Sequence, residues 1–162
     1  LAYRIDTGTS SVSLGDADGD GDLDVATAEE SDHPNEVYLN NGHGDFAEKL
    51  LFGPVWLRTW DVAWGDVDND GDLDLASGNS YSPTVVYFNE LVTATPSFTL
   101  VNPIYLGTIG YRSLSVAFGD VDGDCDLDLA VGNDGGQNVI YLNTLLGGCA
   151  HLPVIMRNYP QP

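Results

Sequence analysis

The sequence has few basic residues and no long apolar run. Lys and Arg together number 5, against 25 Asp and Glu, so the formal net charge is −20. A chain with this charge repels nucleic acid and anionic membranes, so we expect cations as partners and no nucleic acid. No stretch of roughly 18 apolar residues occurs, so we also expect no membrane insertion.

Cysteine is scarce as well, being present only as Cys125 and Cys149. The two could form one disulfide in an oxidising compartment, and two free thiols fit the sequence equally well. Apolar residues make up 43% of the 162 residues. A chain of this length and composition buries a core of ordinary domain size, so it should fold rather than remain a disordered acidic tail.

An internal repeat organises the chain. The string Gly-Asp-x-Asp-x-Asp-x-Asp-Leu-Asp occurs at 15–24, 65–74 and 119–128, in steps of 50 and 54 residues. Each copy lies between two short apolar segments of β-like composition, which are 12–14 and 23–26, 62–64 and 73–76, and 116–118 and 127–131. We therefore predict a strand, a loop and a strand in each copy.

Further β-like segments complete each repeat. A third segment recurs at 37–40, 86–89 and 140–143, and a weaker fourth segment occurs at 46–52 and 98–101. The remaining strand could come from 151–157 or from 1–5. Four short strands in about 50 residues are typical of a propeller blade. We predict an all-β fold of three four-stranded antiparallel β-propeller blades. They should form one unit over 1–162, with repeats at about 1–52, 53–103 and 104–157.

Three blades are too few to close a ring. Two explanations stay open from the sequence: the chain is part of a longer propeller, or identical chains assemble into one, for example a dimer with six blades. A closed symmetric assembly would remove the exposed sheet edges that otherwise promote aggregation.

The aspartates of each loop occupy positions 1, 3, 5, 7 and 9. Two carboxylates held 5 Å apart repel by roughly 3 kcal/mol at an effective dielectric near 20, so a compact loop needs a cation. Hard oxygen ligands in this number favour calcium over zinc, copper or magnesium. We expect three calcium ions, one per repeat. The candidate ligands are Asp16, Asp18, Asp20, Asp22 and Asp24; Asp66, Asp68, Asp70, Asp72 and Asp74; and Asp120, Asp122, Asp124, Asp126 and Asp128.

Position 6 distinguishes the third loop. Gly21 and Gly71 occupy it in the first two copies, where a sharp turn needs positive φ, whereas Cys125 takes it in the third. A residue with a side chain costs about 1 kcal/mol in that conformation, so the third site is expected to be the weakest. An EF-hand is excluded, because its position 12 would be Glu. The residues there are Thr27, Ser77 and Val131.

These segments resemble a known family. The runs at 11–20, 61–70 and 115–124, continued by Asp-Leu-Ala-Val-Gly-Asn at 128–133 and Val-Ile-Tyr-Leu-Asn at 139–143, are similar to FG-GAP (VCBS-type) repeats. Such repeats form the calcium-bearing blades of integrin alpha-subunit propellers and of many secreted bacterial proteins. The resemblance covers most of the chain, but the family's propellers usually close with more than three blades.

The resemblance implies how calcium would be held. Side chains at positions 1, 3, 5 and 9 would ligate the ion, and position 7 would give its backbone carbonyl, so Asp22, Asp72 and Asp126 would act through the main chain. It also implies a secreted or cell-surface protein that binds carbohydrates or proteins.

A tentative ligand site is suggested by Trp56, Arg58 and Trp60, which alternate and would share one face of a strand. Arg112 falls in the same register as Arg58, eight residues before the first Asp of its loop. Two rings beside a guanidinium are typical of a sugar site. The alternative is that the arginines pair with acids and the tryptophans fill space between blades.

Other recurring or isolated residues have plainer interpretations. Tyr38, Tyr87 and Tyr141 recur at one place in the repeat and should pack in the core, as should Trp64. The histidines (His33, His43 and His151) are scattered and should be ordinary surface residues. No catalytic motif is present, and carboxylates bound to calcium are poor general acids, so we expect no enzyme.

The resulting hypothesis is an extracellular, calcium-stabilised β-propeller binding module. Its ligand would be a carbohydrate, as in a lectin, or a protein, as in adhesion. The competing hypothesis is a non-catalytic accessory segment of a larger secreted enzyme or surface protein.

Overall fold

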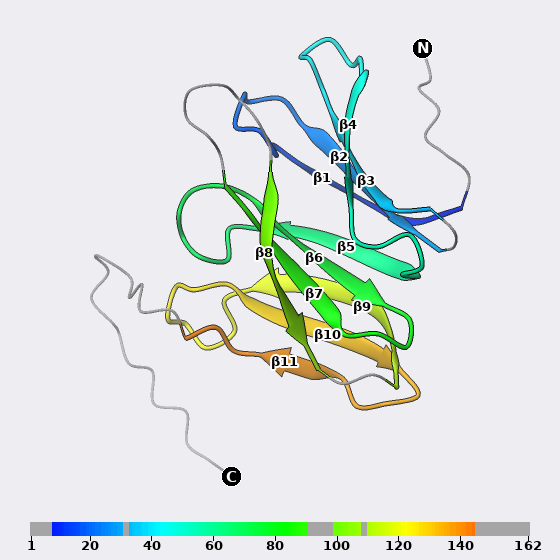
Figure 1. Cartoon of the computed structure of the whole chain (residues 1–162). Helices are drawn as coiled ribbons and strands as arrows, with labels where there is room; N and C mark the ends of the chain where they lie inside the picture. Colours follow the sequence, from blue (N-terminus) through cyan, green and yellow to red (C-terminus); the bar gives the residue numbers. More distant parts are fainter. Residues whose placement is uncertain (1–7, 31–32, 91–98, 108–109, 145–162) are drawn as a thin grey trace.

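The computed structural model describes residues 8–30, 33–90, 99–107 and 110–144, and within these ranges the fold is all-β, as predicted. Three antiparallel sheets follow one another along the chain (Figure 1), and they do not close into a ring. None of the described segments forms a helix that could cross a bilayer.

Each sheet corresponds to one repeat and is called a blade here. Blade 1 contains β1 (Thr9–Gly15), β2 (Asp24–Glu29), β3 (Asn35–Leu39) and β4 (Glu48–Phe52). Blade 2 contains β5 (Thr59–Gly65), β6 (Asp74–Asn79), β7 (Thr84–Asn89) and β8 (Leu100–Leu106). Blade 3 contains β9 (Arg112–Gly119), β10 (Asp128–Asp134) and β11 (Val139–Tyr141).

Two details of the strand predictions need comment. The fourth segment of blade 2 is predicted at 98–101, but β8 extends from Leu100 to Leu106, with Asn102 at a φ of 44°. The segments at 151–157 and 1–5, which could supply a remaining strand, lie outside the described residues. Cys149 and His151 also lie outside them, so the choice between a disulfide and two free thiols stays open.

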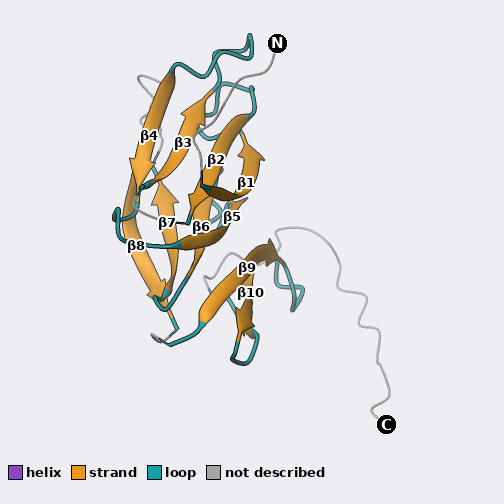
Figure 2. Cartoon of the chain, turned by 90° about the vertical axis from the view of Figure 1, so that its right-hand side faces the viewer, coloured by secondary structure: helices purple, strands orange, loops and turns teal. Residues whose placement is uncertain are grey.

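The blades stack in chain order through their first strands. β5 contacts β1 on one side and β9 on the other (Figures 1 and 2). Asp61 joins all three, because its carboxylate accepts one hydrogen bond from the Ser11 hydroxyl at 2.6 Å and another from the backbone amide of Val116 at 2.9 Å. The shared carboxylate fixes the spacing of three successive blades.

An aromatic ring of one blade packs on a glycine of the preceding blade. Trp64 lies against Gly15, where an added Cβ would be 2.8 Å from the ring, and Phe118 lies against Gly65, where it would be 2.6 Å away. Strand side chains alternate between faces. Residues 62, 64, 116 and 118 therefore point to the preceding blade, and Gly65 points to the following one.

The core lies between the blades, as the stacking requires. One buried cluster joins blades 1 and 2 and the other joins blades 2 and 3. Tyr87 belongs to the first, with its ring 5.4 Å from that of Phe52, and Tyr141 packs against the second. Tyr38 is buried and donates a hydrogen bond to Glu36, and Trp64 packs against the first cluster. The predicted packing of these aromatic residues is confirmed.

Replacing Gly65 by alanine is expected to destabilise the stack. The new methyl group would overlap the Phe118 ring, and overpacking of this kind costs about 1–3 kcal/mol. Urea unfolding measures the change. Gly119→Ala is the matched control, because nothing lies within 4 Å of a Cβ at Gly119. Equal unfolding free energies for the two variants would contradict the stacking.

Candidate metal sites

The three aspartate loops join the first and second strands of the blades and lie on the same side of the stack, at the left in Figure 1. Backbone amides hold the side chains in place. In the first loop, the amide of Gly21 donates to Asp16 at 3.0 Å, and the amide of Asp20 donates to Asp18 at 3.2 Å. The equivalent hydrogen bonds of the other loops run from the Gly71 amide to Asp66 and from the Cys125 amide to Asp120.

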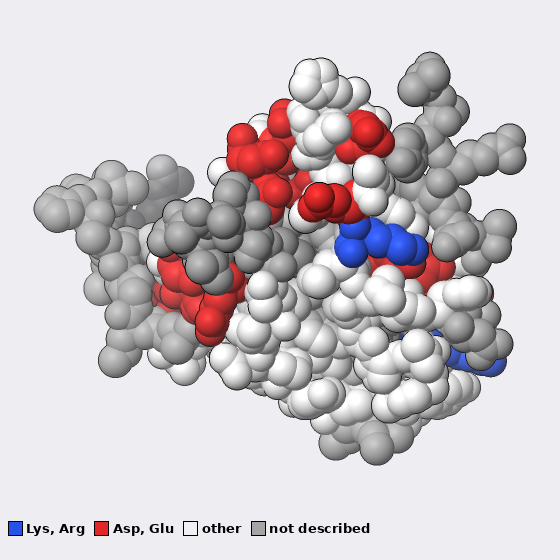
Figure 3. All heavy atoms as spheres, turned by 45° about the horizontal axis from the view of Figure 1, so that its top comes forward, with Lys and Arg blue, Asp and Glu red and all other residues white. Residues whose placement is uncertain are grey.

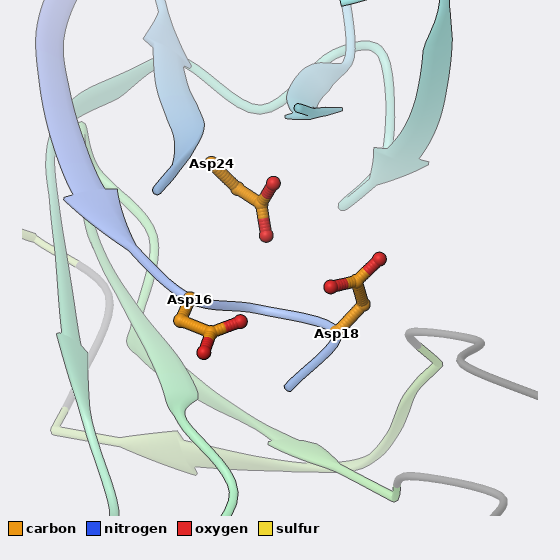
Figure 4. Close-up of side chains that lie close together, drawn as sticks. All are labelled: Asp16, Asp18 and Asp24. Atoms are coloured by element: carbon orange, nitrogen blue, oxygen red, sulfur yellow. The ribbon is translucent and has the colours of Figure 1, made fainter. Parts of the chain in front are cut away.

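Each loop brings three carboxylates together. One oxygen from each member lies within 4.8 Å of the others, and the groups are Asp16, Asp18 and Asp24; Asp66, Asp68 and Asp70; and Asp120, Asp122 and Asp128. In the first group the three carboxylates face a common space (Figure 4). Oxygen clusters of this kind suit a hard divalent cation.

A buried, unpaired oxygen indicates that a cation fits the first loop. Among the described residues, Asp16 Oδ1 is buried without a hydrogen-bond partner. A buried carboxylate oxygen without a partner is costly. An ion held by the Asp16, Asp18 and Asp24 carboxylates would remove that cost.

The aspartate at position 9 has a second role, because it joins its loop to the third strand of its blade. Asp74 accepts hydrogen bonds from the backbone amides of Val67 and Asn89, both at 2.8 Å. Asp24 accepts hydrogen bonds from the backbone amides of residues 17 and 40, and Asp128 accepts them from those of residues 121 and 143, all at 2.7–2.8 Å. All three aspartates are fully buried. This double contact could not be predicted from the spacing of the aspartates.

The remaining aspartates divide by position. Asp22, Asp72 and Asp126, at position 7, belong to none of the three groups. Asp126 is buried and accepts a hydrogen bond from the Asn69 side chain at 2.7 Å, which ties the third loop to the second. At position 5, Asp20, Asp70 and Asp124 each accept a hydrogen bond from the amide two residues further on, and only Asp70 belongs to one of the three groups.

Position 6 has the conformation that the sequence predicts. Gly21, Gly71 and Cys125 have φ angles of 93°, 98° and 75°. Cys125 therefore adopts a conformation that is unfavourable for a residue with a side chain. The carboxylates of Asp120, Asp122 and Asp128 nevertheless converge as those of the first loop do.

Burial and mutual repulsion make these carboxylates hard to ionise. Burial raises the pKa of Asp74 to about 6 and also raises the pKa of Asp24. The pKa values of Asp18, Asp68 and Asp122 are raised too, first by desolvation and then by the neighbouring aspartate at position 5. At Asp128, by contrast, the hydrogen bonds from Val121 and Asn143 outweigh desolvation and lower the pKa.

Without calcium, the protein is expected to be more stable at pH 5 than at pH 7. A folded-state pKa near 6 for Asp74 means that the folded chain binds protons more tightly than the unfolded chain does between about pH 4 and 6. Stability therefore falls as pH rises through that window. Saturating calcium should reverse the order, because protons compete with the ion for the same oxygens. Thermal melts in EGTA at the two pH values test this, and a higher melting temperature at pH 7 would contradict it.

The tentative ligand residues are not arranged as the sequence predicts. Arg112 stacks on the ring of Trp60, with Cζ 4.5 Å from its centroid, and pairs with Asp134 at 3.2 Å. Trp56 and Arg58 precede β5 rather than forming a strand with Trp60. The prediction of a shared strand face is therefore wrong, because Pro54 and the turn at 55–56 delay the strand until Thr59.

A cavity near Trp56 was not foreseen. Trp56, Tyr105 and Tyr87 line a cavity of about 220 Å³, together with Pro54, Leu57, Ser82, Pro83 and Val85. Trp56 and Tyr105 are largely exposed. Tyr105 lies in the part of β8 beyond the predicted end of that strand, so no pattern in the sequence could place it beside Trp56.

Charge is distributed unevenly over the surface. Figure 3 shows acidic side chains gathered toward the top and left of the view, and a broad area without charged side chains at the lower centre. Lys49, the only lysine in the chain, is partly exposed and pairs with the buried carboxylate of Glu36 at 2.6 Å.

Comparison with known proteins identifies the family of the chain. Among curated proteins no significant match is found. The family model described as FG-GAP-like repeat matches residues 16–77 and 66–131, which together span more than half of the chain. The two matches begin at the first aspartate of the first and second loops, one blade apart. The chain therefore belongs to the FG-GAP-like repeat family.

Proposed function

We propose that the protein is an extracellular, calcium-stabilised β-propeller binding module. The observation that carries the proposal is the convergence of three carboxylates in each loop, with one oxygen of Asp16 buried and unpaired. FG-GAP-like repeats are typical of extracellular proteins, where millimolar calcium is available. Calcium in this role is structural, and the proposal includes no catalytic step.

Calcium would act by neutralising charge at the loops. Three divalent ions would raise the formal charge from −20 to about −14, since each ion adds two charges. The ions would join residues of the loop that otherwise repel one another. The position-9 aspartates would connect the calcium-bound loops to the blades, because they accept hydrogen bonds from the backbone at the ends of the third strands.

For the ligand we propose a carbohydrate. The cavity lined by Trp56 and Tyr105 supports this, because exposed aromatic rings pack well on the apolar faces of sugars, and its lining contains hydroxyls but no charged side chain. Trp60, Arg58 and Arg112 are not part of that lining. A protein ligand, as in adhesion, is the alternative within the same proposal.

A glycan array in millimolar calcium tests the ligand, with Trp56→Ala as the diagnostic variant. We expect binding to a defined group of glycans and at least a tenfold loss in the variant. Tyr81→Asn is the matched control. It removes an exposed aromatic ring outside the cavity, at a φ of 54° that asparagine tolerates. Absence of binding to every glycan on the array would overturn the carbohydrate proposal and leave a protein ligand or an accessory role.

A further inference from the structure

The two ends of the stack expose apolar side chains that the repeat buries elsewhere. In blade 1, Val12 is 57% exposed, whereas its counterparts Val62 and Val116 are 3% and 5% exposed. In blade 3, Ile140 is 54% exposed, whereas its counterpart Val37 is fully buried. The exposure differs because Val62, Val116 and Val37 are covered by an adjacent blade and lie in the clusters between blades.

Each end presents one half of the contact that joins successive blades. The leading face is formed by Val12, Leu14 and Leu23 of blade 1, all of them exposed. The trailing face is formed by Gly119, Val121 and Ile140 of blade 3. Leu14 stands where Trp64 and Phe118 stand in the other blades, and Gly119 stands where Gly15 and Gly65 stand.

The trailing face is open at the position that receives a ring in the other blades. A Cβ added at Gly15 or Gly65 would meet the aromatic ring of the next blade, but no atom of the described residues lies within 4 Å of one added at Gly119. Val121 beside it is 55% exposed, whereas its counterpart Ala17 is fully buried. A side chain the size of leucine would cover both.

A polar contact between blades shows the same pattern. The Asn89 side chain donates to the Ala17 carbonyl of the preceding blade at 2.8 Å. The Asn143 side chain repeats this with the Val67 carbonyl at 2.7 Å. Asn40 is the counterpart in blade 1, and its side chain donates instead to the Leu23 carbonyl of its own blade at 3.2 Å.

We propose that the leading face of one copy of this chain docks on the trailing face of a second copy, head to tail. The contact would continue the two inter-blade interfaces already present, with Leu14 over Gly119 and Asn40 directed at the Val121 carbonyl. Both complementary halves belong to the same chain, so a second copy can present each exposed face with its complement. Two copies that dock at both ends form a six-bladed ring without exposed apolar faces.

Light scattering of the full chain in millimolar calcium tests the proposal. We expect a species of twice 17.3 kDa at micromolar concentration. Leu14→Asp and Gly119→Leu should each give a monomer with an unchanged circular dichroism spectrum. Leu14 is exposed, and the space at Gly119 is open within one chain. Leu51→Asp, at a similarly exposed leucine of β4, is the matched control and should leave the dimer intact.

Mixing the two variants distinguishes a head-to-tail contact from a symmetric one. The Gly119→Leu chain keeps an intact leading face and the Leu14→Asp chain keeps an intact trailing face, so the mixture should regain a dimer through one native interface. A monomeric parent protein would overturn the proposal. A dimer that persists in both variants, or a mixture that stays monomeric while each variant is folded, would overturn it as well.

Discussion

Removal of calcium is expected to lower the melting temperature of the protein by roughly 20 °C or more. A ligand present at a thousandfold excess over its Kd adds about 4 kcal/mol to stability, so three sites together add roughly 12 kcal/mol. That amount is comparable with the whole stability of a typical domain, about 5–15 kcal/mol. Thermal melts followed by circular dichroism, in 2 mM calcium and in excess EGTA, measure the difference.

Two controls separate a specific ion effect from charge screening. Added sodium chloride should restore only a small part of the stability lost in EGTA, because it screens repulsion without ligating the loops. Magnesium should restore less than calcium, since it prefers a rigid octahedral shell. Melting temperatures that agree within a degree or two in calcium and EGTA would rule out a structural role for the ion.

The largest effect of a single substitution is expected for Asp74→Asn. The carboxylate accepts hydrogen bonds from the amides of Val67 and Asn89, and both oxygens are needed for this. Asparagine has only one acceptor oxygen, so one buried amide would face an NH₂ group. Loss of a charged hydrogen bond and burial of an unpaired donor cost roughly 2–4 kcal/mol together. Urea unfolding in calcium measures it.

The size of the effect should depend on calcium. In EGTA the wild-type carboxylate is itself unfavourable at neutral pH, because burial raises its pKa to about 6, so the loss caused by Asp74→Asn should shrink. Asp72→Asn makes the same chemical change in the same loop at a residue outside the carboxylate group, and should cost far less. Equal losses for the two variants would show that position 9 has no special role.

Much of the fold could be predicted from the sequence, because the repeat places equivalent residues in equivalent environments. The β1–β2 hairpin and its counterparts follow from apolar segments on either side of a loop with fixed spacing. The positive φ at Gly21, Gly71 and Cys125 follows from the geometry of a tight turn. Agreement among three copies makes such predictions far firmer than a single motif allows.

The features that sequence reasoning missed depend on contacts between segments that lie far apart in the chain. The cavity lined by Trp56 and Tyr105 needs the loop before β5 to meet β8. The stacking of Arg112 on Trp60 joins two blades. Trp56, Arg58 and Trp60 alternate in the sequence, but alternation has structural meaning only within a strand, and the strand begins at Thr59.

The most direct test of the account is the number of calcium ions bound per chain. Isothermal titration of calcium into the chelator-stripped protein, checked by metal analysis after dialysis, should give three ions per chain. Asp16→Ala, Asp66→Ala and Asp120→Ala should each reduce that number by one. Absence of bound calcium at millimolar concentration, with the protein folded, would contradict the assignment of the aspartate loops.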